Sequence, residues 1–169
     1  MNTLAGYSRI VVSLAICAAA FAQPQQSPQT PVQRVGRYFT GVNDQIIEMA
    51  KDFPADKYDF RLTPEMRSFG ELIVHIASGN VYAAKFGRGE QVKWDELDAK
   101  DYKGKDAIVA LMQKSIEDAT ATMKSNPEGP KKSGEPYLAV MQHSSEHYGL
   151  LVAYYRANGL VPPASRPKK

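Results

Sequence analysis

The sequence predicts an all-α protein, an antiparallel four-helix bundle preceded by an N-terminal signal peptide. Four long stretches repeat apolar residues at spacings of three and four, which is the period of an amphipathic helix. No stretch has the sustained alternation of a half-buried strand. Segments rich in proline, glycine or charge separate the four stretches, so each helix can turn back and pack against the others.

Residues 1–22 have the form of a secretory signal peptide. Arg9 is the only charged side chain here, an apolar run follows over 10–20, and Ala20-Phe21-Ala22 has the small-x-small form of a cleavage site. The run is too short to span a bilayer, so we expect no stable membrane insertion. A lipoprotein box at 14–17 is poor, which makes lipid anchoring the weaker alternative. The mature chain is therefore expected to be periplasmic or secreted.

Cleavage after Ala22 would change the chemistry available to the chain. It removes Cys17, the only cysteine, so a metal site in the mature protein must use nitrogen and oxygen ligands. It also removes Arg9, which lowers the formal charge from +3 to +2. The basic doublets at 131–132 and 168–169 lie in a loop and a tail without interleaved aromatic residues, so we expect no nucleic-acid partner.

Residues 32–166 are predicted to form a single helical domain. Residues 23–31 are rich in proline and glutamine and are expected to be a disordered tether, and residues 167–169 are a short tail. The first helix is expected to end at Pro54. Its apolar seam is Val32, Val35, Phe39, Val42, Ile46, Met49 and Phe53.

Three more helices are expected. The second covers about 68–86 and begins with the capping-box sequence Ser68-Phe69-Gly70-Glu71. A charged segment over 90–103 follows, long enough to cross from one end of a bundle to the other. The third helix is predicted over about 105–124, and the fourth over about 136–158.

The three histidines of the chain all lie on core-facing helix surfaces. His143 and His147 are four residues apart, so their imidazoles share one face of the fourth helix and can converge. That face continues through Val140 and Leu151, and is therefore apolar. His75 lies on the inward side of the second helix. The residues alone leave two interpretations: each ring bonds a carbonyl or hydroxyl group, or the rings bind a metal ion.

A histidine in the second helix, with His-x-x-x-His in the fourth running into Tyr148-Gly149, resembles the DinB/YfiT-like superfamily of metal-binding four-helix bundles. The resemblance covers about residues 32–166 and is strongest to secreted members. Leu150 departs from the family, which often has glutamine there. The other segments that carry the resemblance are Tyr58-Asp59-Phe60-Arg61, Thr63 to Leu72 and Asn158 to Arg166.

The resemblance implies one divalent transition metal bound by His75, His143 and His147. Three neutral imidazoles with a fourth position open is the ligand set of catalytic zinc sites, and nitrogen ligands also suit nickel, iron or copper. Glu71 is one turn before His75 and can orient it, although its place in the capping box competes. The sequence does not assign a catalytic residue. The candidates for orienting a ligand or lining the pocket are Glu71, Asn80, Tyr82, Ser144 and Tyr148.

Two functions of different class follow. The first is an exported metal-dependent enzyme acting on an unknown small molecule. Some relatives are thiol-dependent transferases or isomerases, but export makes a cytosolic thiol less available and favours hydrolase chemistry. The second is a non-catalytic metal-binding or stress-associated protein. Relatives are often dimers, so a homodimer is also expected. A haem bundle is disfavoured, because His143 and His147 lie a turn apart on one helix and Cys-x-x-Cys-His is absent.

Overall fold

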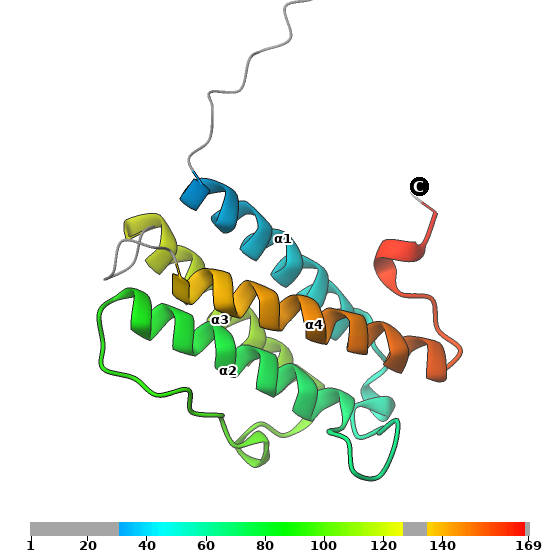
Figure 1. The fold of residues 1–169 in the computed structure, drawn as a ribbon. Coiled ribbons are helices and arrows are strands. Elements are labelled where there is room, and N and C mark those ends of the chain that lie inside the picture. Colours follow the sequence, from blue (N-terminus) through cyan, green and yellow to red (C-terminus); the bar gives the residue numbers. More distant parts are fainter. Residues whose placement is uncertain (1–30, 127–134, 168–169) are drawn as a thin grey trace, which may run out of the picture.

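The computed structural model describes residues 31–126 and 135–167, which form four long helices (Figure 1). Within these ranges there is no β-strand, so the prediction of an all-α fold with four helices is confirmed. Among the described helices, none combines the length and the apolar character that a membrane-spanning helix requires. The helices are α1 (Pro31–Asp52), α2 (Phe69–Gly87), α3 (Gly104–Ser125) and α4 (Glu135–Ala157), with short 3-10 turns at Ala55–Lys57, Ala99–Asp101 and Pro163–Ser165.

The start of α2 is set by local side-chain chemistry. The Ser68 hydroxyl accepts a hydrogen bond from the Glu71 N–H at 3.2 Å, and the Glu71 carboxylate accepts one from the Ser68 N–H at 2.7 Å. This is the capping box expected from the sequence. The predicted signal peptide over 1–22 lies outside the described residues, as does the tether up to residue 30. Pro31, expected to end the tether, is the first residue of α1.

Helices α1 and α4 run in the same direction. Near their starts, the rings of Phe39 and Tyr137 pack edge to face with centroids 6.4 Å apart. Near their ends, the Tyr155 hydroxyl donates to the backbone carbonyl of Met49 at 2.8 Å. The two helices therefore lie side by side in parallel rather than antiparallel (Figure 1).

Helices α2 and α3 are also parallel to each other, and they run opposite to α1 and α4. Gly70 lies against Ile108 where both helices begin, and Gly87 lies against Thr122 where both approach their ends. Among the helix pairs that pack extensively against each other, the predicted antiparallel arrangement therefore holds for α1 with α3 and for α2 with α4, but not for α1 with α4 or α2 with α3. The reason is the connection over 88–103, which carries the chain back along the bundle before α3 begins (Figure 1).

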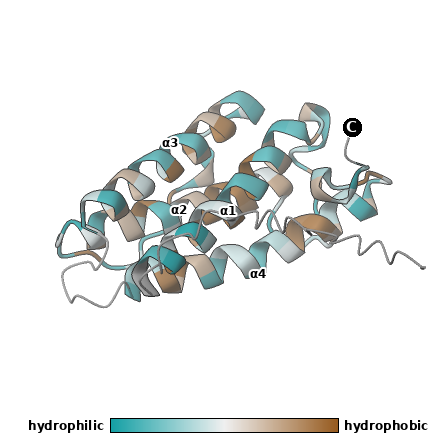
Figure 2. Ribbon diagram, turned by 90° about the horizontal axis from the view of Figure 1, so that it is seen from above, coloured by the Kyte–Doolittle hydropathy of each residue, from teal (hydrophilic) through white to brown (hydrophobic). Residues whose placement is uncertain are grey.

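The interior of the bundle is apolar at both ends and contains polar residues between them. At one end Phe53 stacks on Phe69 with ring centroids 3.8 Å apart. Figure 2 shows hydrophobic residues on the inward faces of the helices and hydrophilic residues outside. Asn80 is fully buried and donates to Asn43 Oδ1 at 3.0 Å and to Ser115 Oγ at 3.3 Å. Buried polar groups need such partners, so this triplet aligns α1, α2 and α3.

We predict that Gly87→Ala destabilises the protein by about 1–3 kcal/mol, because the packing there has no room for a methyl group. A Cβ atom at Gly87 would lie 2.1 Å from the hydroxyl oxygen of Tyr137, whose ring is fully buried. The matched control is Gly41→Ala in α1, where nothing beyond the adjoining residues and the nearby helix backbone lies within 4 Å of the added Cβ. It should stabilise α1 by up to about 1 kcal/mol. Urea unfolding checks both, and equal changes in the two variants would contradict the packing argument.

Candidate metal centre

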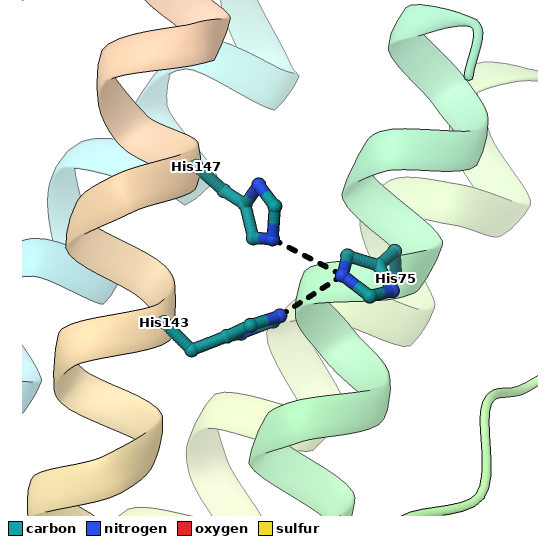
Figure 3. A group of neighbouring side chains, drawn as sticks. All are labelled: His75, His143 and His147. Carbon is teal, nitrogen blue, oxygen red and sulfur yellow. Dashed lines mark hydrogen bonds between the residues drawn. The ribbon is translucent and has the colours of Figure 1, made fainter. Parts of the chain in front are cut away.

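The three histidines meet between α2 and α4. Figure 3 shows the His143 and His147 rings pointing from α4 toward the His75 ring on α2. The Nε2 atom of His75 lies 2.9 Å from Nε2 of His143 and 3.1 Å from Nε2 of His147. One ring nitrogen from each histidine falls within 4.8 Å of the others, and such a group can hold a metal ion.

Hydrogen bonds alone do not satisfy this cluster well. A neutral imidazole has one N–H donor and one acceptor lone pair, yet Nε2 of His75 faces two other Nε2 atoms. Nε2 of His75 can form a well-aligned hydrogen bond with one of these two atoms, as donor or as acceptor, but not with both. A cation between the rings would accept all three lone pairs. Imidazole nitrogens bind zinc at about 2.0–2.1 Å, and the close approach of the three rings fits a group that could share one ion.

Burial favours the neutral form of all three imidazoles. Burial is the main cause that lowers the pKa of His75 and of His147. Burial also lowers the pKa of His143, to about 4, with further contributions from the neighbouring His147 and His75 rings and from Arg67. Neutral imidazoles are the form that binds metals, so the protein keeps these lone pairs free of protons at neutral pH.

Glu96, which the sequence did not single out, lies at the outer nitrogen of His75. Its Oε1 is 3.0 Å from Nδ1 of His75, close enough for an ion pair but not aligned as a hydrogen bond. Partial burial opposes the charge on Glu96, but the Arg67 guanidinium and the His75 ring together hold its pKa below the usual value. Glu96 comes from the 88–103 connection, far from His75 in sequence, so no local pattern could have identified it.

Trp94, from the same connection, packs against the other side of the site. Its ring lies 4.9 Å from the His143 ring, measured between centroids. Both residues approach α2 closely at Gly79, one turn after His75. A Cβ atom at Gly79 would lie 2.9 Å from Cη2 of Trp94 and 3.2 Å from Nδ1 of His143. A glycine is therefore needed at this position for α4 and the connection to pack together against α2.

Two of the predicted accessory residues have other roles. The Glu71 carboxylate is 2.7 Å from an Arg61 guanidinium nitrogen and also caps α2, so both of its oxygens are occupied. Asn80 lies in the buried triplet with Asn43 and Ser115, which joins α2 to α1 and α3 rather than to α4. Capping and ion pairing occupy the Glu71 carboxylate, and Asn80 lies on the side of α2 that packs against α1 and α3.

The remaining three candidates lie near the histidines in sequence but contribute differently. Tyr82 packs on Trp94, with ring centroids 5.2 Å apart, and is thus one ring removed from His143. Ser144 is fully buried, and its hydroxyl has no hydrogen-bond partner among the described residues. Tyr148 lines a groove between α1 and α4, away from α2. Tyr82 is therefore connected to the site through Trp94.

The lowered histidine pKa values predict that the metal-free protein loses stability in acid. Below about pH 6.5 the unfolded chain binds more protons at these histidines than the folded chain does. Their contribution to the free energy of unfolding is therefore fully present above pH 6.5, and it is lost as the pH falls toward the pKa of His143, about 4. Because burial lowers the pKa of His143 to about 4, His143→Leu should make the melting temperature less dependent on pH over this window. Melting curves with chelator at several pH values check this, with Gln142→Leu as the control. Equal pH dependence in His143→Leu and wild type would refute it.

The comparisons with known proteins agree with this geometry. No curated protein shows a significant match to the chain. The family model for the DinB superfamily matches residues 38–151, which is more than half of the chain and includes α2, most of α4 and all three histidines. The chain belongs to the DinB superfamily.

Proposed function

We propose that this protein is an exported DinB-superfamily protein that binds one divalent transition metal and uses it for hydrolase- or transferase-type chemistry on a small substrate. The observation that carries the proposal is the convergence of ring nitrogens from His75, His143 and His147 on one point between two helices. The donor set suits zinc, nickel or iron. Export rests on the signal-peptide pattern of residues 1–22.

The ligands and their surroundings support a reactive site. A divalent ion bound there would supply Lewis-acid chemistry, and three neutral ligands would leave its charge uncompensated. A cleft of about 380 Å³ lies beside the site, between α2 and the 88–103 connection. Tyr82, Trp94, Lys85 and Lys93 are among its lining residues. Asp95 also lines the cleft, so it combines aromatic faces with charged groups of both signs and suits a small substrate that has a flat apolar part and a polar group.

A non-catalytic metal-binding protein is the second candidate, and the contacts of Glu96 favour it. Glu96 is the carboxylate nearest to His75, and a hydrolase would need a group near the metal that can take up a proton. The two oxygens of Glu96 lie 3.2 and 3.0 Å from nitrogens of the Arg67 guanidinium. A carboxylate held in this way is better suited to support a ligand than to transfer protons.

We predict that the protein, purified without a metal-binding tag, binds close to one divalent transition metal per chain. Trp94 is the only tryptophan, and its ring contacts His143, so titration with Co²⁺ or Ni²⁺ should quench the tryptophan fluorescence. Metal at a hundredfold excess over its Kd should stabilise the fold by about 2.7 kcal/mol. His147→Ala should abolish both effects, whereas the exposed neighbour variant Glu146→Ala should not. Absence of metal after reloading the wild-type protein would refute the site.

Measuring turnover with and without the metal ion distinguishes a metal-dependent enzyme from a non-catalytic metal-binding protein. Ester, amide, phosphoester and thiol-transfer substrates are tested with the metal-loaded protein, the chelated protein and His143→Ala. We expect turnover of one substrate class that disappears with the ion and in the variant, because only a catalyst depends on the metal for rate. Turnover that is equal with and without metal would contradict a metal-dependent enzyme. Full metal binding without turnover of any class would favour the second candidate.

A further inference from the structure

We propose that Glu96 is the positioning residue of the metal centre: its carboxylate accepts the Nδ1 proton of His75 and thereby keeps Nε2 of that ring turned toward the metal. The proposal rests on the metal-binding function proposed above. It gives the 88–103 connection a role in metal affinity in addition to its role in joining α2 to α3.

The first step of the argument concerns the proton of His75. A neutral imidazole that offers Nε2 to a metal must carry its proton on Nδ1. Nδ1 of His75 is buried, so that N–H group requires an acceptor. Glu96 Oε1 is 3.0 Å away, so this carboxylate is a charged acceptor within hydrogen-bond distance of that nitrogen. Carboxylates in this position fix the tautomer and the ring orientation of metal-binding histidines and make them stronger ligands.

The second step concerns the support of Glu96. Its carboxylate is fixed by the guanidinium of Arg67 through contacts of 3.2 and 3.0 Å. The backbone of Arg67 is fixed in turn, because its carbonyl accepts a hydrogen bond from the Tyr154 hydroxyl of α4. A continuous set of contacts therefore runs from α4 through Arg67 and Glu96 to His75 on α2. An exposed carboxylate that would otherwise sample many rotamers is held at the Nδ1 side of the ring.

The third step is the contrast with His143. Its Nδ1 is buried without a hydrogen-bond partner among the described residues, and it lies against Gly79, with Trp94 beside it. Packing therefore sets the orientation of the His143 ring, whereas a charged acceptor is available to set that of His75. For this reason we assign the electrostatic support of the centre to Glu96.

The test compares Glu96→Ala with Glu90→Ala. Glu90 lies in the same connection, has similar side-chain exposure at 44% against 41%, and pairs with Arg88 at 2.8 Å instead of with a histidine. Competition with a chelator gives the Kd for Zn²⁺. Loss of a supporting group of this kind weakens metal binding by about 10- to 100-fold, so we expect that loss in Glu96→Ala and wild-type affinity in Glu90→Ala. Glu96→Gln keeps an acceptor oxygen without the charge and should be intermediate.

A second readout reports the proton itself. In the zinc-loaded wild-type protein, ¹⁵N-edited NMR should show a slowly exchanging Nδ1–H resonance of His75, and Glu96→Ala should lose its protection. Wild-type zinc affinity in Glu96→Ala, or an equal loss in Glu90→Ala, would overturn the proposal while leaving the metal site intact. Failure of the wild-type protein to bind zinc would instead overturn the proposed function, and this inference with it. Because Glu96 is partly exposed, metal-free Glu96→Ala should melt like the wild type.

Discussion

The antiparallel packing of α2 against α4 is the constraint on which the candidate site depends. It sets His75 opposite one turn of α4, between His143 and His147. Each residue adds about 1.5 Å along a helix, so a slip of one or two residues between the helices would separate the three nitrogens. The close approach at Gly79 helps to set this register, because a larger residue would push His143 away.

The parallel arrangement of α2 and α3 also explains which residues surround the histidines. Because α2 and α3 run in parallel, the chain must return along the bundle after Gly87, and the returning segment passes over the histidines. It places Trp94 on His143 and Glu96 at His75. A short hairpin between two antiparallel helices would have left these histidines without either neighbour. The long connection therefore provides groups around the three rings that the four helices do not.

The residues that stabilise the fold and the residues that could bind a metal lie at different positions along the bundle. Aromatic rings such as Phe53 and Phe69 pack tightly where α1 ends and α2 begins, and Tyr137 fills the opposite end. The histidines lie between these ends, in surroundings that penalise a positive charge on the rings. Burial of three neighbouring imidazoles costs stability in acid, but it also reduces competition between protons and a metal ion.

Local patterns along the chain predicted the features that depend on residues close together in sequence. Apolar periodicity located the four helices, the capping box located the start of α2 at Phe69, and the spacing of His143 and His147 placed both rings on one face. Helix packing sets which groups from distant parts of the chain come into contact. It made α2 and α3 parallel, left Glu71 at its cap with Arg61, and brought Glu96 to His75 instead. The residues in these contacts are far apart in sequence, and no periodic pattern relates them. Their contacts therefore follow only from how the whole bundle packs.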